Sequence, residues 1–175
     1  MQLNYSTGGK PMKRSKIISA ITIFSVLFML LTGCASDPVA DDFTNYMNNQ
    51  MQAVSKMQNA YLILLSDISD SKDTDVQTVI TKMKKEVLPS SDKLIAEAKK
   101  IVPATVEVKN LHNKYIAAMS KQNIGLAKML EGLTNSNNET VTAGSKIVTE
   151  ANSEYALFIK ELNALAKAHG LEVKN

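Results

Sequence analysis

The stretch NETVTAGSKIVTEANSEYALFIKELNALAKAHG, residues 138–170, decides the expected fold. Nearly every third or fourth residue in it is apolar or small, which is the spacing of one face of a helix. These positions are Val141, Gly144, Val148, Ala151, Tyr155, Phe158, Leu162, Leu165 and His169. The helix is expected to begin either with the capping-box spacing Ser136–Glu139 or with Asn138. Gly170 suits the left-handed residue that ends a helix, with Leu171 packing back on the last turn.

The segment 38–69 has the same spacing. Asp37 is placed to cap it, and Pro38 suits the first helical position. The stripe reads Phe43, Met47, Gln50, Val54, Met57, Tyr61, Leu64 and Ile68, of which all but one are apolar. We therefore expect one long amphipathic helix here, followed by a polar turn.

A second segment reaches from about residue 73 to residue 102 and contains Pro89. Because proline removes a helical hydrogen bond, we expect a kink there, or else a new helix capped by Ser90 or Ser91.

The third segment is expected to open at Pro103, and Gly125 lies on its apolar side, where it would allow another helix to come close. No Asn-Gly or Asp-Gly hairpin and no sustained alternation of apolar and polar residues occurs in the sequence. The sequence therefore predicts an all-α fold, a four-helix up-down-up-down bundle that follows an N-terminal signal segment.

The first residues have the order of a secretory signal peptide. The basic group Lys13-Arg14 with Lys16 precedes an uncharged apolar run of 16 residues, Ile17–Thr32. A membrane span needs roughly 20 residues, so the run favours a cleaved signal over a retained anchor helix. Residues 1–11 are either an extension of the signal or lie upstream of a true start at Met12.

The apolar run ends in Leu31-Thr32-Gly33-Cys34, which resembles the lipobox of bacterial lipoproteins. The resemblance covers residues 12–34. It implies cleavage between Gly33 and Cys34 and a diacylglycerol lipid, with fatty acids such as palmitate, on Cys34. Residues 1–33 would then be the signal, 34–37 the lipidated N-terminus with a short tether, and 38–171 the helical bundle. The implied location is the extracytoplasmic face of the cell membrane.

Removing the signal changes the charge of the chain. Four of its 20 basic residues precede Gly33, so 16 lysines remain against 17 acids, and the formal charge changes from +3 to about −1. Nucleic-acid binding needs a basic face, so we expect no nucleic-acid partner. Cys34 is the only cysteine, so the exported part has no internal disulfide. The richness in Lys, Asn and Ile indicates a low-G+C Gram-positive bacterium.

Catalytic and metal-binding patterns do not stand out. The Glu-x-x-His pattern of metal-binding bundles is absent, because Lys109 stands three residues before His112 and Ala166 three before His169. We expect His112 at the surface or boundary of the bundle and His169 at a helix C-terminus, where a positive charge is favoured. The sequence predicts a protein that is not an enzyme and has no metal or cofactor beyond the covalent lipid.

The exported part contains six methionines, and flexible methionines usually fill irregular space in a core. They also suit an adaptable apolar groove. The residues expected to line such a groove between helices are Met47, Met51, Tyr61, Met119 and Tyr155.

These features together predict a membrane-tethered, non-enzymatic interaction or accessory module of the cell envelope, with an envelope protein as partner. The alternative is a carrier of a small apolar ligand in the groove between the helices. Only Ala35, Ser36 and Asp37 separate Cys34 from the first helix. At about 3.3 Å per residue this tether reaches roughly 10 Å, so the bundle is expected to stay close to the membrane.

Overall fold

The structure, a computed structural model, describes residues 27–28, 37–69 and 75–174. Its helical elements are α1 (Pro38–Asn45), η3 (Tyr46–Gln50), α2 (Met51–Ser69), α3 (Val76–Lys82), η4 (Met83–Val87), α4 (Leu88–Ala98), α5 (Val106–Thr134) and α6 (Asn138–Ala168), where η marks a π-helical turn. They join into four helical segments in the described ranges, which confirms the predicted all-α class. No helix in those ranges has a stretch long and apolar enough to cross a bilayer.

The first helical segment begins where the sequence predicts. Asp37 is its N-cap, and Oδ1 of this residue accepts hydrogen bonds from the amides of Val39 and Ala40 at 3.0 and 3.2 Å. Pro38 follows in the first turn. A carboxylate here satisfies amides that have no helical acceptor and interacts favourably with the helix dipole. The predicted extent, residues 38–69, is confirmed.

A π-helical turn in this segment changes which side chains face the core. In η3 the amide of Met51 donates to the carbonyl of Tyr46, five residues earlier, so the turn contains one extra residue. Tyr46 and Met51 are both buried, whereas Gln50 is only half-buried. Met51 thus takes the place on the apolar stripe at which a regular helical spacing puts Gln50.

Pro89 is accommodated by a second π-helical turn. The amide of Leu88 donates to the carbonyl of Met83 in η4, and Pro89 follows at the start of α4. Proline has no amide hydrogen to donate, so a wide turn directly before it avoids an i-to-i−4 bond that could not form. The expectation that Ser90 or Ser91 caps a new helix was wrong, because the helical backbone is continuous into α4 and Ser91 is fully buried.

The third helical segment begins three residues later than predicted. α5 starts at Val106 with Thr105 as its N-cap residue, and not at Pro103. The residues before it form a connection in which the amides of Ala104 and Thr105 donate to the carboxylate of Asp42 in α1. These bonds hold Thr105 in an extended conformation and delay the start of the helix.

The fourth helical segment begins at Asn138, which was one of the two expected starts. Its cap is Asn137, whose Oδ1 accepts a hydrogen bond from the amide of Thr140 at 3.0 Å. Ser136 has a φ of 53° and belongs to the turn before the helix. The expected helix start at Ser136, with a capping box to Glu139, was therefore wrong.

The end of α6 agrees with the sequence. Gly170 has a φ of 69°, in the region that residues with a Cβ rarely adopt. The amide of Leu171 donates to the carbonyl of Ala166 at 2.8 Å, and that of Gly170 to Lys167 at 3.2 Å. This is the Schellman arrangement, and Leu171 packs against the core as expected.

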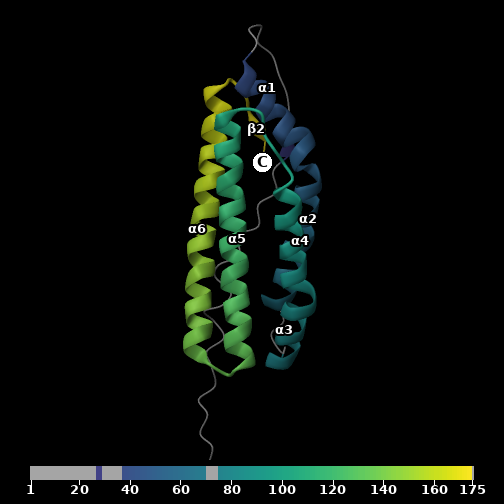
Figure 1. Cartoon of the computed structure of the whole chain (residues 1–175), viewed down its shortest axis with the longest axis vertical. Coiled ribbons are helices and arrows are strands. Elements are labelled where there is room, and N and C mark those ends of the chain that lie inside the picture. The colour runs from purple at the N-terminus through teal and green to yellow at the C-terminus, as the bar shows by residue number, and fades with distance from the viewer. Residues whose placement is uncertain (1–26, 29–36, 70–74, 175) are drawn as a thin grey trace, which may run out of the picture.

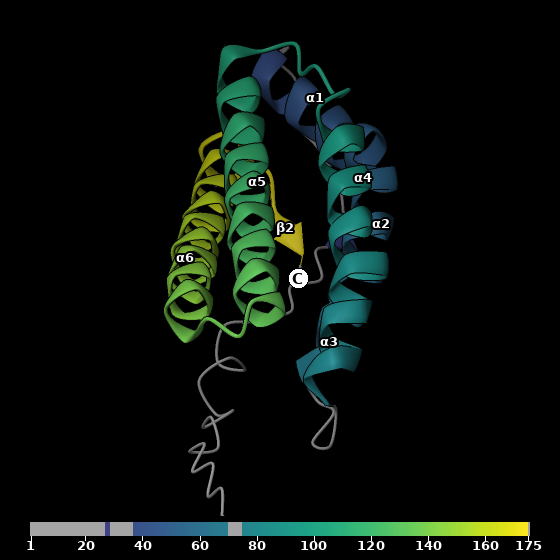
Figure 2. The same ribbon diagram turned by 60° about the horizontal axis from the view of Figure 1, so that its bottom comes forward.

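Helices α5 and α6 lie side by side and form the most extensive helix pair of the described chain (Figures 1 and 2). Gly125 and Gly144 face each other in this pair. A Cβ on Gly125 would lie 2.7 Å from Cγ2 of Val148 and 3.0 Å from the carbonyl oxygen of Gly144. The predicted role of Gly125 in a close helix approach is confirmed.

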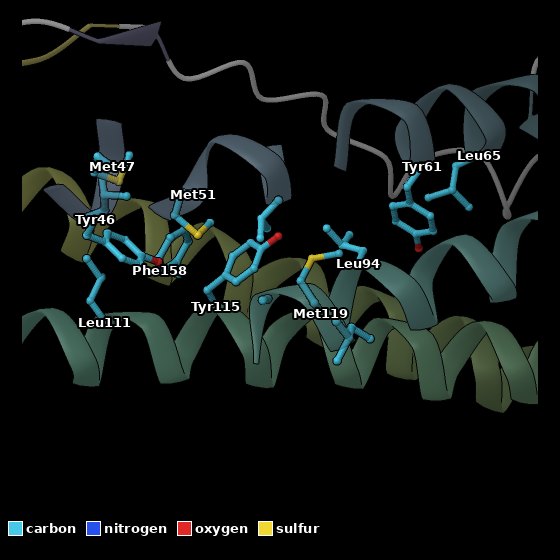
Figure 3. Packing of buried hydrophobic residues seen from close by; sticks show 14 of the residues in the cluster. Tyr46, Met47, Met51, Tyr61, Leu65, Leu94, Leu111, Tyr115, Met119 and Phe158 are labelled. Carbon is cyan, nitrogen blue, oxygen red and sulfur yellow. The ribbon is translucent and has the colours of Figure 1, made fainter. Parts of the chain in front are cut away.

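The core lies between this pair and the first two helical segments (Figure 3). All four segments contribute fully buried side chains, namely Tyr46, Val54, Tyr61, Val87, Leu94, Val108, Tyr115 and Leu162. Burying a large apolar side chain contributes about 1.5–3 kcal/mol. The apolar stripes therefore hold the segments together, because isolated helices are only marginally stable in water.

Two short strands, β1 (Leu27–Phe28) and β2 (Val173–Lys174), pair antiparallel. β1 lies within the expected signal, so cleavage before Cys34 would remove the strand with which β2 pairs. The rest of the expected signal, Cys34 and tether residues 35–36 lie outside the described residues.

Candidate functional site

A hydrogen bond joins the start of the first helical segment to the end of the last one, three residues after Cys34 in the sequence. Oδ2 of Asp37 lies 2.6 Å from Nδ1 of His169, the C-cap residue of α6. The bond to His169, together with those from the amides of Ala40 and Val39, lowers the pKa of Asp37 below its ordinary value of 3.8. The expected position of His169 at a helix C-terminus is confirmed, whereas its carboxylate partner was not predicted.

A second carboxylate joins α1 to the start of α5. Asp42 is only 6% exposed. It accepts hydrogen bonds from the amides of Ala104 and Thr105 at 3.1 and 2.7 Å and from the Thr105 hydroxyl at 2.7 Å. Burial raises the pKa of Asp42, but the bonds from Thr105 and Ala104 outweigh it and the pKa is lowered overall. Asp42 is therefore an ionised, fully bonded group inside the protein.

His112 lies in the core, so its expected position at the surface or boundary was wrong. The side chain is 2% exposed. Its Nε2 lies 3.0 Å from the carbonyl oxygen of Ala98, an acceptor, so Nε2 carries the hydrogen. Nδ1 is then free to accept from the Tyr46 hydroxyl at 3.1 Å. Burial lowers the pKa of His112, which keeps the ring neutral around neutral pH.

The helical phase contains a signal for this buried histidine. His112 directly follows the buried Leu111 and stands three residues before the buried Tyr115. Its ring stacks on Tyr115 with the centroids 6.3 Å apart. A residue at the edge of an apolar stripe can face the core. Because histidine is polar, it was expected at the surface in spite of this position.

Two glutamines each connect a tyrosine to a polar side chain of another helical segment. Gln58 accepts from the Tyr115 hydroxyl at 3.0 Å and donates to the Tyr155 hydroxyl at 2.9 Å. In the same way Gln122 accepts from Tyr61 at 2.9 Å and donates to Asn152 at 3.1 Å. Each glutamine thus uses both ends of its amide to link different helical segments, a role that was not predicted from the sequence.

The residues expected to line an apolar groove are mostly part of the core. Met47, Met51, Tyr61 and Met119 are between 0% and 7% exposed and belong to one packed cluster (Figure 3). Tyr155 is half-buried and packs against that cluster. The structure thus brings the five residues into one interior, where they contact other side chains of the protein.

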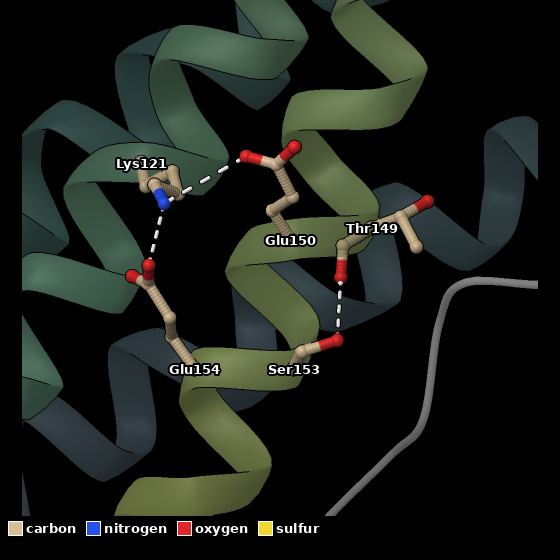
Figure 4. A network of polar contacts seen from close by, with 5 residues as sticks. All are labelled: Lys121, Thr149, Glu150, Ser153 and Glu154. Carbon is tan, nitrogen blue, oxygen red and sulfur yellow. Dashed lines mark hydrogen bonds and ion pairs between the residues drawn. The ribbon is translucent and has the colours of Figure 1, made fainter.

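A charged group lies on the α5–α6 pair. Lys121 of α5 lies 2.5 Å from Glu154 and 3.8 Å from Glu150 of α6 (Figure 4). The bond to Glu154 raises the pKa of Lys121. Ion pairs at a solvent-accessible surface add little stability, so this group mainly favours one alignment of the two helices.

The interior polar groups are suited to holding the helices in place. Burial raises the pKa of Tyr46, Tyr61, Tyr115 and Tyr155, so their hydroxyls stay protonated. Satisfied buried networks of this kind fix one arrangement of a core. Among the described residues, no group of three His, Cys, Asp or Glu side chains could hold a metal ion.

Comparison with known proteins identifies a family. Residues 15–166 match the family described as EMYY-motif containing lipoprotein. The match includes Cys34 with the whole apolar run before it, and nearly all helical residues. No curated protein and no solved structure matches the chain. The sequence does not contain Glu-Met-Tyr-Tyr as a contiguous run. The resemblance to bacterial lipoproteins seen at Leu31–Cys34 is confirmed, and the chain belongs to the family of EMYY-motif containing lipoproteins.

Proposed function

We propose that this lipoprotein is a non-enzymatic accessory module of the cell envelope. Diacylglycerol on Cys34 would hold it on the extracytoplasmic face of the cell membrane after cleavage behind Gly33. The observation that carries the proposal is where the helical part begins. Asp37, three residues after Cys34, already caps α1 and bonds to the end of α6. A lipid anchor this close to the helical part keeps that part at the membrane surface.

The four helical segments are inferred to form an up-down-up-down bundle. The short turn at residues 135–137 supports this topology, because it joins α5 to α6, which lie side by side. The bonds of Asp37 to His169 and of Asp42 to Thr105 support it as well. They connect α1 both to the residue before α5 and to the end of α6, as an up-down-up-down topology requires.

Binding to an envelope protein is favoured over catalysis because the buried tyrosines and the buried histidine are already bonded to partners inside the protein. The hydroxyls of Tyr46, Tyr61 and Tyr115 and the imidazole of His112 all have partners within the core. The surface therefore has to provide the interaction. With a formal charge of about −1 after cleavage, this surface is not expected to bind nucleic acid.

The carrier function is the weaker alternative. Four of the five residues expected to line a groove pack into the core instead of facing an opening. A ligand would have to separate side chains that contact one another, which has a cost in packing energy.

Photo-crosslinking in the host tests the proposed function. A photoreactive side chain at Leu157 of α6, which is 56% exposed, is expected to give one discrete adduct with an envelope protein. The same probe in a Cys34→Ala chain is the control and should lose the adduct. Failure of probes at Leu157, Ile63 and Ile124 to give an adduct, with a small apolar molecule retained in native mass spectrometry, would favour the carrier instead.

A further inference from the structure

Two valines are the most exposed of the large apolar side chains in the described chain. Val102 is 71% exposed and Val106 is 69% exposed. Val102 lies in the connection between α4 and α5, and Val106 is the first residue of α5. Between them lie buried Pro103 and the extended N-cap residue Thr105. These two exposed side chains leave apolar surface in contact with water.

This connection lies at the end of the molecule where the helical part begins, next to the proposed lipid anchor. Asp42 bonds to Ala104 and Thr105, which lie between the two valines. Asp42 is five residues from Asp37 on one continuous helix, a rise of about 7.5 Å. Asp37 in turn is three residues from Cys34, a reach of roughly 10 Å. The valines are therefore within a short distance of any bilayer that holds a lipid on Cys34.

We propose that the connection 101–106 is a membrane-seating surface, with Val102 and Val106 entering the headgroup region of the bilayer to which Cys34 is anchored. This inference rests on the proposed lipid anchor and adds an orientation to it. The anchor and the valines would make two contacts at one end. The bundle would then stand on the membrane by that end, with the turn at residues 135–137 directed away from it.

The charges near the connection indicate whether apolar contact or attraction to anionic lipid would hold it on the membrane. Lys99, Lys100 and Lys109 are exposed there, but so are Asp41 and Glu107, and Lys100 is already paired with Glu97 at 2.5 Å. This mixture does not give the basic face that attraction to anionic lipid requires. The contact is therefore apolar, and it should not depend on anionic lipid.

A single tryptophan tests the seating, because the chain has none of its own. Val106→Trp is compared with Ile124→Trp, whose site is 61% exposed in the same helix and about 27 Å further along it. The lipidated mature protein of each variant is purified from the host and reconstituted into phosphatidylcholine vesicles with or without brominated acyl chains. We expect Val106→Trp to shift its emission to shorter wavelength on reconstitution. Brominated lipid should quench it at least threefold more strongly than Ile124→Trp.

Equal quenching of the two variants would overturn the proposal, as would quenching of Val106→Trp only after anionic lipid is added. If the emission of Val106→Trp already lies at short wavelength without vesicles, the proposal is also overturned, because protein would then cover position 106. Flotation with the vesicles separates failure of the seating from failure of the anchor. Protein that floats but is not quenched contradicts the seating alone, whereas protein that does not float and lacks the acyl mass contradicts the proposed function.

Discussion

The carboxylate of Asp37 and the imidazole of His169 lie 2.6 Å apart, although 132 positions separate the two residues in the chain. The same carboxylate caps α1 through the amides of Val39 and Ala40. One side chain therefore fixes the beginning of the helical part to its end, at the point where the lipid-bearing cysteine would join it. An anchor on Cys34 would thus be attached to a helix that is itself bonded to the rest of the fold.

The charge of Asp37 should make the stability of the protein depend on acid pH. Its pKa is lowered in the folded state, so its ionisation stabilises the fold above the unfolded value of 3.8, and this contribution is lost as the pH falls through the folded value. Asp37→Asn keeps an oxygen for the cap but removes the charge. The difference in melting temperature between wild type and Asp37→Asn should therefore be larger at about pH 6 than at about pH 3. Asp41→Asn, in the same turn and exposed, is the control, and a constant difference for Asp37→Asn would contradict the prediction.

His112→Phe should destabilise the protein by about 1–3 kcal/mol at about pH 8, because it leaves the Tyr46 hydroxyl buried without a partner. The Ala98 carbonyl loses the bond from His112 but keeps the one from the amide of Ile101. Burial lowers the pKa of His112, so wild-type stability should fall as the pH drops below the ordinary value of 6.5, where the unfolded chain takes up a proton first. His112→Phe should lose this part of the pH dependence. Urea unfolding at two pH values measures both effects, and His169→Phe, which removes the other histidine, should retain the fall caused by His112.

Gly125→Ala should destabilise the α5–α6 pair. The added Cβ would lie 2.7 Å from Cγ2 of Val148 and 2.8 Å from its backbone nitrogen. Overpacking of this kind exceeds the gain of about 1 kcal/mol in helix propensity, so a net loss of about 1–3 kcal/mol is expected in chemical denaturation. Adding Val148→Ala should rescue only part of the loss, because the backbone nitrogen stays in place. Unchanged or increased stability of Gly125→Ala would show that the helices are further apart than described.

Asp42→Asn should weaken the connection between α4 and α5. An amide side chain offers one acceptor oxygen and no charge, so the variant is expected to lose about 1.5–3 kcal/mol. The amides of Ala104 and Thr105 should also exchange their hydrogens faster with solvent. Glu107→Gln, at an exposed site nearby, serves as the control and should stay within about 0.5 kcal/mol of wild type. Unchanged exchange at both amides in Asp42→Asn would contradict the assigned bonds.

Much of the fold follows from local sequence signals. The apolar period predicts the extent of the first segment, Asp37 predicts its cap, and Gly170 predicts the end of α6. Gly125 lies on an apolar face and has no side chain that would keep a neighbouring helix away, so a close helix approach can be predicted there. These features depend on neighbours within one or two helical turns, which periodicity and cap chemistry describe well.

Other features depend on contacts between distant segments. The extra residue of η3 shifts the helical phase, so that Met51 faces the core where a regular helix would place Gln50. A regular helical period cannot predict this shift. Asp42 and His112 look like surface residues by type. Both are buried because partners from other segments satisfy them, and one helix considered alone does not show those partners.

The state of Cys34 tests the proposed anchoring most directly. In the host, labelled fatty acid should enter the wild-type protein, and the mature chain should begin at an acylated Cys34. Cys34→Ala should carry no label and should accumulate with the residues before position 34 still attached. Label that persists in Cys34→Ala, or a wild-type chain with an unmodified Cys34, would contradict the lipid anchor and with it the seating of the bundle on the membrane.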